Sequence, residues 1–190
     1  MYNKLVTFLV FSLYAPLAAF SADDPSRARL YIPVSTNVTF EGCTTCEGKA
    51  SGYAAQYVFG FGLGLGVASS KLAISSPNTD FSLDTGPMMD IGYTFGSDFT
   101  FTLGVGAGGS PTSDKFISGV NYKIEGKSAS TSFLGLGYSF GSIEILLALR
   151  NSSAKFDESY NISVLGMSFA ASYANEYQWQ TTDIGIGFTF

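Results

Sequence analysis

Large apolar side chains alternate with small or polar ones along most of this chain, and this period of two constrains the fold more than any other feature. A period of two is typical of β-strands, because successive side chains of a strand point to opposite faces. The pattern is clearest in 57–67, where glycine occupies four of the positions between large apolar residues. It recurs, with breaks at turn-type sequences such as Gly96-Ser97-Asp98, up to the last residue. The candidate strands are 29–40, 53–67, 86–95, 99–108, 130–140, 143–150, 160–173 and 179–190.

The composition of the two faces decides which kind of sheet is expected. A soluble barrel fills its interior with large side chains and shows polar and charged residues to water. Here the large apolar face is matched by a face of Gly, Ser, Thr and Ala, and only 13% of all residues are charged. Small residues suit the narrow interior of a barrel whose large residues contact lipid. Because backbone groups in a bilayer must pair internally, such strands must close into a ring. The sequence predicts an all-β fold, an eight-stranded antiparallel transmembrane β-barrel.

The number of strands is expected to be eight, with two assignments open. Bacterial single-chain barrels have an even number of strands, and only seven candidates are clear. Adding 29–40, the weakest candidate, makes eight, but it places the short turns at 96–98 and 141–142 on the outside of the cell. Short turns usually face the periplasm. The alternative leaves 29–52 as a periplasmic arm and divides 157–190 into three short strands.

Residues 1–21 have the three-part pattern of a secretory signal peptide. Lys4 precedes a short apolar stretch, and Ala19-Phe20-Ser21 places small residues before a cut ahead of Ala22. An N-terminal membrane anchor is the alternative, which the short apolar core disfavours. No apolar run of 18 residues follows that could span a membrane as a helix. We therefore expect a signal peptide at 1–21, an N-terminal arm or first strand at 22–52, and the barrel at 53–190.

The two cysteines of the chain, Cys43 and Cys46, form a Cys-Thr-Thr-Cys unit. In an exported protein a local disulfide is the default expectation. A reduced pair and a redox-active pair are the alternatives, and the redox motif lacks its usual βαβ context. Haem attachment requires a histidine where Glu47 stands, and a structural zinc requires four ligands. We expect a disulfide here, and no metal or cofactor.

Histidine is absent from the whole chain, which excludes catalysis by an imidazole base and zinc sites with histidine ligands. The acidic balance, 10 Lys+Arg against 15 Asp+Glu with no basic cluster, argues against a nucleic-acid partner. Gly104-x-Gly106-x-x-Gly109 matches the letters of a dinucleotide-binding motif, but no helical pattern follows it. These glycines are better explained as making room inside the barrel for larger neighbours. No catalytic site is expected.

Four charged residues fall on the small-residue face that would line the barrel: Asp90, Glu144, Arg150 and Asp183. A carboxylate in a narrow, poorly hydrated interior is costly unless it is paired or hydrated. Facing positions around the 141–142 turn do not bring Arg150 next to Glu144. We expect a salt-bridged, water-containing interior, with a polar plug, a proton path or paired catalytic acids as the functional alternatives. Candidate partners for the carboxylates are Arg27, Arg29, Lys71 and Lys123.

The last residues carry a resemblance to a known family. Ile184, Ile186, Phe188 and the terminal Phe190 resemble the C-terminal signal of Gram-negative outer-membrane proteins, which the barrel-assembly machinery reads. Together with the signal peptide and the alternating segments, the chain resembles the small outer-membrane barrels of the OmpA, OmpX and opacity-protein type. The resemblance covers 53–190 and is architectural. It implies an outer-membrane location, contact with outer-membrane lipid, and the assembly machinery as a partner during biogenesis.

The function expected from these features is a structural or surface-interaction, adhesion-like role, with a host or surface ligand bound through loops. Candidate loops are 68–85, 109–128 and the shorter 151–159, since the loops of small barrels usually carry binding. A narrow small-solute channel is the first alternative, because an eight-stranded barrel has room only for side chains or one small ligand. A secreted, soluble ligand-binding β-barrel is the second.

Deletion of Phe190 from the full chain is expected to impair assembly in the outer membrane of a Gram-negative host, because it removes the terminal aromatic residue of the assembly signal. The measurement is a gel of the membrane fraction run with and without boiling, in which a folded barrel migrates differently from the boiled chain. An unchanged shifted band in the outer-membrane fraction would count against this interpretation of the C-terminus.

Overall fold

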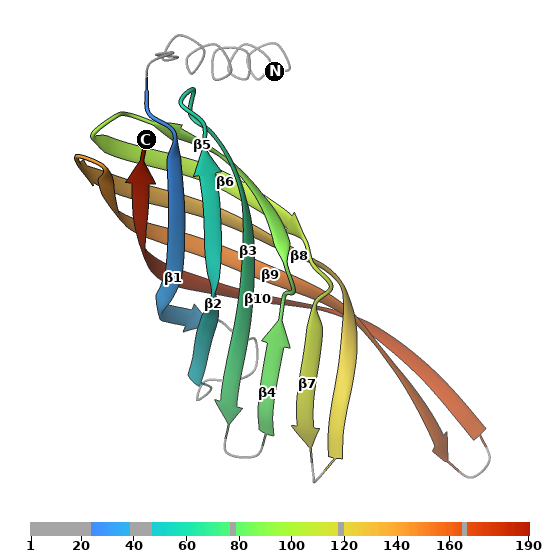
Figure 1. The fold of residues 1–190 in the computed structure, drawn as a ribbon. Helices are drawn as coiled ribbons and strands as arrows, with labels where there is room; N and C mark the ends of the chain where they lie inside the picture. The colour runs from blue at the N-terminus through green and yellow to red at the C-terminus, as the bar shows by residue number, and fades with distance from the viewer. Residues whose placement is uncertain (1–23, 39–46, 77–78, 118–119, 165–166) are drawn as a thin grey trace, which may run out of the picture.

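The computed structural model describes residues 24–38, 47–76, 79–117, 120–164 and 167–190, and their regular structure is β throughout (Figure 1). Across these residues, no helix is long and apolar enough to cross a membrane. Every strand pairing is antiparallel. The strands are β1 (Arg27–Val38), β2 (Glu47–Val58), β3 (Leu63–Ser76), β4 (Thr79–Asp84), β5 (Met88–Phe95), β6 (Phe99–Gly108), β7 (Thr112–Ile117), β8 (Val120–Phe140), β9 (Ile143–Val164) and β10 (Met167–Thr189).

Eight of these strands form a closed ring in the order β2-β1-β10-β9-β8-β6-β5-β3, and β3 pairs back to β2. The closure joins the first strand to the last, with Arg27 opposite Thr189 and Trp179 opposite Val38. The amide of Phe190 also donates to the carbonyl of Ser26 at 3.0 Å. The predicted eight-stranded antiparallel barrel is therefore confirmed, and both ends of the described chain lie at one end of it.

The remaining strands, β4 and β7, continue the wall where β5 and β6 stop. β3 pairs with β5 near the chain ends and with β4 further along, while β8 pairs with β6 and then with β7. The breaks fall at Thr85-Gly86-Pro87 and at Gly109-Ser110-Pro111, where Gly86 and Gly109 have positive φ angles of 65° and 75°. Proline cannot donate a ladder hydrogen bond, so the ladder breaks at these two points. β4 and β5 together therefore act as one strand of the wall interrupted by a turn, and β6 and β7 act as another.

Several strand boundaries differ from the predicted ones. The expected single strand 53–67 is a hairpin, in which β2 ends at Val58 and β3 begins at Leu63. The turn between them uses Gly62 at a φ of 91°, and its amide donates to the carbonyl of Phe59 at 2.7 Å. The alternation runs through this turn without interruption, because Phe59 and Phe61 keep the period of two, so the sequence pattern conceals it.

This extra hairpin resolves the conflict over the short turns. The candidate 29–40 does form the first strand, as β1, while the candidate 160–173 spans the end of β9 and the start of β10. The added strand changes the parity, so the turns at 59–62, 96–98 and 141–142 lie at the same end as the chain termini (Figure 1). That is the arrangement in which short turns face the periplasm.

The opposite end, here called the projecting end, is where β9 and β10 continue past their neighbours (Figure 1). β8, β9 and β10 contain 21, 22 and 23 residues, about twice the 9–11 that a tilted strand needs to cross a bilayer. The prediction that 68–85, 109–128 and 151–159 are loops is wrong. Most of their residues belong to β3, β4, β7, β8 and β9.

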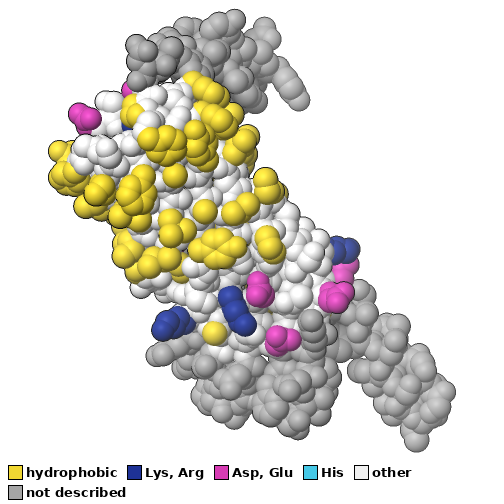
Figure 2. Space-filling view, in the orientation of Figure 1, with side chains coloured by type: hydrophobic (Ala, Val, Ile, Leu, Met, Phe, Trp, Pro, Cys, Tyr) yellow, Lys and Arg dark blue, Asp and Glu magenta, His cyan; other side chains and the backbone are white. Residues whose placement is uncertain are grey.

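Large apolar side chains cover the outside of the barrel near the chain ends. Figure 2 shows them gathered on that half of the molecule, with most of the visible charged side chains nearer the projecting end. Leu147 and Ile186 are 47% and 44% exposed, whereas their neighbours Leu146 and Ala148 face inward and are buried. Aromatic pairs such as Tyr93–Phe95 and Tyr138–Phe140 mark the edge of this apolar belt at the short turns. Such a girdle is typical of a transmembrane barrel.

Replacement of Leu147 by arginine tests whether this belt contacts lipid. A charge near the middle of the apolar belt is expected to lower the free energy of unfolding by about 2–4 kcal/mol. Gln178→Arg, beyond the belt on β10, is the control, and a cost of about 0–1 kcal/mol is expected. Urea titration in lipid vesicles measures both values, and equal costs would contradict the assignment of the belt.

Candidate functional site

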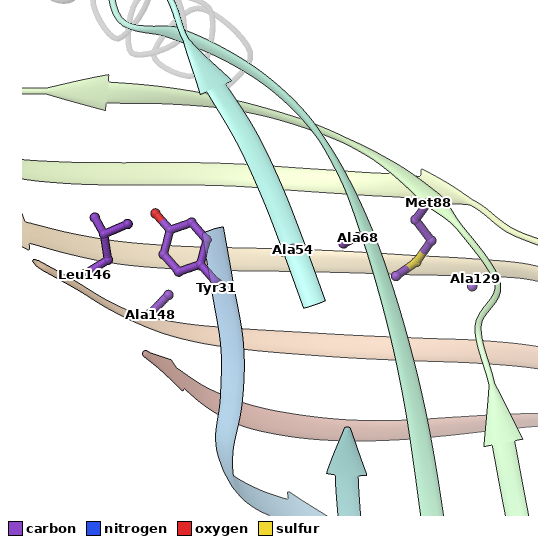
Figure 3. Packing of buried hydrophobic residues seen from close by; sticks show 7 residues of the cluster. All are labelled: Tyr31, Ala54, Ala68, Met88, Ala129, Leu146 and Ala148. Carbon is purple, nitrogen blue, oxygen red and sulfur yellow. The ribbon is translucent and has the colours of Figure 1, made fainter. Parts of the chain in front are cut away.

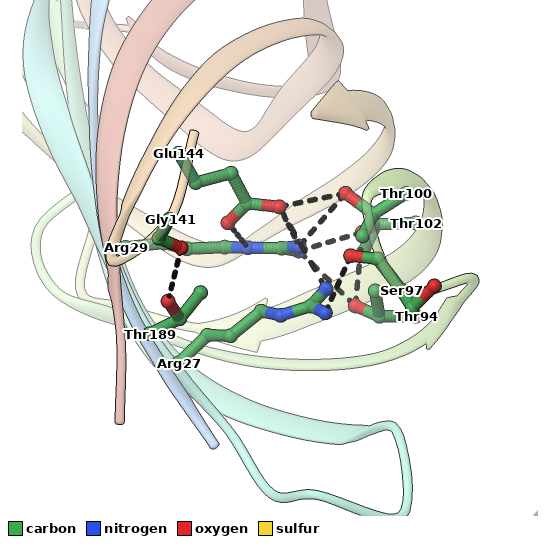
Figure 4. Close-up of polar contacts among 9 residues, drawn as sticks. All are labelled: Arg27, Arg29, Thr94, Ser97, Thr100, Thr102, Gly141, Glu144 and Thr189. Atoms are coloured by element: carbon green, nitrogen blue, oxygen red, sulfur yellow. Dashed lines mark hydrogen bonds and ion pairs between the residues drawn. The ribbon is translucent and has the colours of Figure 1, made fainter. Parts of the chain in front are cut away.

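The interior of the barrel holds two separate clusters of buried charges. The first, the Arg29 cluster, consists of Arg27, Arg29 and Glu144 with three threonines, and lies near the short turns (Figure 4). The second, the Arg150 cluster, consists of Asp90, Arg150 and Asp183 with Thr131 and Phe133, and lies further into the barrel. The four charged residues named from the sequence are thus divided, with Glu144 apart from the other three.

Arg29 and Glu144 form a bidentate pair at the centre of the Arg29 cluster. The guanidinium Nε donates to Oε2 at 2.8 Å and Nη2 donates to Oε1 at 2.7 Å. Both side chains are completely shielded from solvent. Because two parallel hydrogen bonds fix the geometry as well as the charge, such a pair also fixes the position of β1 relative to β9, the two strands that flank β10.

Threonines of β5 and β6 satisfy the remaining donors of Arg29. Its Nη1 donates to the hydroxyl oxygens of Thr94 and Thr102 at 3.1 and 2.8 Å. Its Nη2 donates to Thr100, whose hydroxyl donates in turn to Oε1 of Glu144 at 2.7 Å. Arg27 lies 3.8 Å from the same carboxylate and donates to the carbonyl of Ser97 at 2.8 Å. The cluster thus links β1, β5, β6 and β9 across the interior.

The Arg150 cluster holds two carboxylates on one guanidinium. Nη1 of Arg150 donates to Oδ2 of Asp90 at 2.9 Å, and Nε lies 3.4 Å from Oδ2 of Asp183. The guanidinium also lies over the ring of Phe133, 4.6 Å from its centroid. The other oxygen of each aspartate, Oδ1, has no hydrogen-bond partner among the described protein atoms. The Arg29 cluster carries a net positive charge and the Arg150 cluster a net negative charge, and the two charges balance.

Glycines on the inner face make room for these side chains. A Cβ added to Gly137 would collide with Thr100 and Glu144, and one added to Gly104 would collide with the ring of Phe133. The inner-face residues are therefore small because they accommodate large side chains from the neighbouring strands. The glycines therefore alternate with large residues because they make room for the ion clusters, and not because they line an open lumen.

Two sets of apolar residues are also buried in the interior. Figure 3 shows one set, which includes Tyr31, Met88 and Leu146. A second set closes the barrel towards the projecting end, where Leu72, Leu83 and Phe156 are almost fully buried. The indole of Trp179 packs in this second set and donates to the hydroxyl of Ser70 at 3.1 Å.

The partners proposed from the sequence fall into three groups. Arg27 and Arg29 lie with Glu144, whereas the Lys71 side chain is exposed on the outer face. The side chain of Lys123 and both cysteines, Cys43 and Cys46, lie outside the described residues. The C-terminal Ile184, Ile186, Phe188 and Phe190 all face outward, between 44% and 68% exposed.

Sequence reasoning missed the threonines of the Arg29 cluster. Thr94, Thr100 and Thr102 all fall on the inward face of the alternation, next to the turn at 96–98, so their side chains share one level of the barrel. This shared level was the signal in the sequence that could have grouped the three threonines. Which arginine they bind could not be read from the pattern, because that depends on how the ring closes.

The hydroxyl of Thr100, which lies against Glu144, is completely buried, as is the carboxylate that accepts its hydrogen bond. Each carboxylate of the two clusters is held by an arginine, and Arg29 and Arg150 each lie within hydrogen-bond distance of two or more acceptors. The geometry is that of an interior cross-braced by buried ion pairs and hydrogen bonds.

Removal of one partner of the Arg29–Glu144 pair is expected to be severely destabilising. Glu144→Ala leaves a guanidinium buried without its counter-charge, at an expected cost of about 3–5 kcal/mol in the free energy of unfolding. Lys155→Ala, which breaks the exposed Lys155–Glu176 pair, is the control and is expected to cost about 0–1 kcal/mol. Urea titration in vesicles measures both. The double variant Arg29→Met/Glu144→Leu should recover much of the loss, and a loss at least as large as that of Glu144→Ala would contradict this account.

Comparison with known proteins identifies the fold. No protein-family model matches the sequence, and no curated protein matches it. Among solved structures, Neisserial surface protein A matches with a TM-score of 0.56 and 13% identity, over 87% of this chain and 96% of that one. Ail, the attachment invasion locus protein of Yersinia pestis, matches with a TM-score of 0.55 and 11% identity, over 88% and 99%. The chain thus has the fold of the small outer-membrane β-barrels, as the resemblance of its sequence implied.

Proposed function

We propose that this chain is an integral outer-membrane β-barrel protein of a Gram-negative bacterium with a surface-interaction, adhesion-like role and no catalysis. The observation that carries the proposal is the length of the wall beyond the apolar belt, combined with a filled interior. A barrel that is closed along its axis and extended on one side is suited to presenting a rigid surface.

The projecting end is built from continuous strands. β9 and β10 pair without a break from Phe188 opposite Ile143 to Met167 opposite Val164. The neighbouring strands stop earlier, since β8 pairs with β9 only as far as Phe156 and β1 pairs with β10 only as far as Trp179. The segments 157–164 and 167–178 therefore form a two-stranded ribbon, here called the β9–β10 ribbon, that stands out from the barrel (Figure 1).

Paired charges begin at the base of this ribbon. Lys127 forms an ion pair with Asp157, and Lys155 lies 3.5 Å from Glu176, all on exposed side chains. This change from an apolar belt to a charged wall is what a membrane boundary produces. It supports an orientation in which the short turns face the periplasm and the ribbon faces the medium, where a host or surface ligand would bind.

The filled interior bears on the alternative of a narrow small-solute channel. The Arg29 cluster spans the barrel near the short turns, and the Leu72–Phe156 set closes it towards the projecting end. A passage would require both to rearrange. A secreted soluble barrel is disfavoured by the exposed apolar belt, which water would not tolerate over so large an area.

Export and assembly complete the proposal. We infer that residues 1–21 are removed as a signal peptide and that Cys43 and Cys46 form a local disulfide in the segment joining β1 to β2. The outward-facing Ile184, Ile186, Phe188 and Phe190 at the end of β10 would be read by the barrel-assembly machinery. Their position on the closing strand, paired with β1, supports such a role during ring closure.

The ribbon can be shortened without touching the barrel. Replacement of 158–173 by Asn-Gly joins Asp157 to Ala174, which already face each other, through a two-residue turn. Bacteria expressing this variant are expected to lose adherence to cultured epithelial cells, while the heat-dependent gel shift of the outer-membrane fraction is unchanged. The control is the full chain expressed to the same level.

Full adherence by the shortened variant would contradict the adhesion-like role. Purified full chain is also added to planar lipid bilayers, where no steady single-channel conductance is expected. A steady conductance would support the channel alternative instead. If larger side chains placed in the interior then abolished that conductance, the channel alternative would be established.

A further inference from the structure

The outer wall carries a row of side chains that changes character partway round the barrel. In the register of the ring, Ile91, Val105, Ser132, Asn151 and Gln180 follow one another across β5, β6, β8, β9 and β10. All five are exposed on the outer face. The row is apolar on β5 and β6 and polar from β8 onward, so one line across the wall joins two kinds of surface.

Two hollows lie along this row and form one groove, here called the Ser132 groove. The first has a volume of about 650 Å³ and its exposed lining includes Leu103, Val105, Leu134 and Leu149. The second has a volume of about 460 Å³ and is lined by Ser, Thr, Asn and Gln residues together with Trp179. Ser132, Asn151 and Gln180 line both, which makes the groove continuous. Each volume lies in the range of small-molecule sites, about 300–1,000 Å³.

The polar half of the groove lies on the projecting side of the apolar belt. On β8 the outward positions change from Leu134 to Ser132, and on β9 they change from Leu149 to Asn151, in each case towards the projecting end. The groove therefore crosses the boundary of the belt. A molecule that fills it must be apolar at one end and polar at the other.

The polar half is hydrogen-bonding but uncharged. The hydroxyls of Ser130 and Ser153 lie 2.8 Å apart, and Nε2 of Gln180 donates to Oδ1 of Asn151 at 3.1 Å. Each side-chain amide has both donor and acceptor groups, so one bond between them leaves capacity for a ligand. No Lys, Arg, Asp or Glu is among the described residues that line the groove.

This neutral lining selects among membrane amphiphiles. A phosphate group binds best where arginine or lysine supplies charge-assisted hydrogen bonds. Lys155, the next outward residue of β9 beyond Ser153, is engaged with Glu176 at 3.5 Å. Hydroxyl and amide groups of a sugar, in contrast, pair well with serine, asparagine and glutamine.

We infer that the Ser132 groove binds one acylated sugar of the outer leaflet, with an acyl chain along Leu103, Leu134 and Leu149 and the sugar against Asn151 and Gln180. The inference rests on the outer-membrane placement proposed above. The small side chain of Ser132, set between larger neighbours, provides the depth at the point where chain and sugar join.

Two detergents with the same dodecyl chain test the inference: dodecyl maltoside, whose head is an uncharged sugar, and dodecylphosphocholine, whose head contains a phosphate. The barrel is purified in tetraethylene glycol monooctyl ether and titrated with each detergent, and retained molecules are counted by native mass spectrometry. Wild type is expected to retain one dodecyl maltoside and to release dodecylphosphocholine.

Ser132→Phe fills the groove and is expected to abolish retention of dodecyl maltoside. The matched control is Ala55→Phe, because Ala55 is also a small outward residue, on β2 opposite Leu30 and Val67, away from the groove. This control should retain the detergent as wild type does. Asn151→Ala/Gln180→Ala, which keeps the apolar half, is expected to weaken retention about tenfold, as the loss of two hydrogen bonds implies.

Equal retention of the two detergents by wild type would overturn the inference, as would unchanged retention by Ser132→Phe. The heat-dependent gel shift is read on every sample. A variant that keeps the shift shows that the barrel is folded, so a negative binding result then counts against the groove alone and leaves the proposed surface role intact.

Discussion

Closure of the backbone hydrogen-bond ladder is the constraint on which the rest of this structure depends. A sheet in a bilayer cannot leave an edge unpaired, because no water is available to replace the missing bonds. The chain meets this requirement by pairing β1 with β10 and β2 with β3, which brings Arg27 beside Thr189 near the two ends of the described chain. Once the ring is closed, the alternation assigns every second side chain to lipid and the others to a narrow interior.

The narrow interior then dictates its own chemistry. Arginines and carboxylates can occupy it only as hydrogen-bonded clusters, since an unpaired buried charge costs several kcal/mol. Arg29 and Arg150 each gather partners from several strands, and glycines such as Gly104 and Gly137 provide the space on neighbouring strands. The same packing that stabilises the ring also fills it. This packing supports the proposal that the functional surface lies on the outer wall and at the projecting end.

The wall divides along its length into two environments. Near the short turns it is apolar outside, while towards the projecting end the outer face becomes polar and then charged, with pairs such as Lys155–Glu176. The transition falls at different strand positions around the barrel, and on β8 and β9 it falls beside Ser132 and Asn151. The Ser132 groove lies where the apolar and polar parts of the outer face meet, and the β9–β10 ribbon extends beyond the charged part.

The sequence by itself determined the class of fold and the two faces of each strand, because a period of two is a local property that survives any arrangement of the strands. It also placed Asp90, Glu144, Arg150 and Asp183 on the inner face. It did not reveal the turn at 59–62, where Phe59 and Phe61 keep the alternation, nor that the expected loops are strands. Only the tertiary structure decided that Glu144 pairs with Arg29 and that Arg150 holds both aspartates. Those partners lie between 33 and 115 residues apart in the chain, and the register of the closed ring alone brings them together.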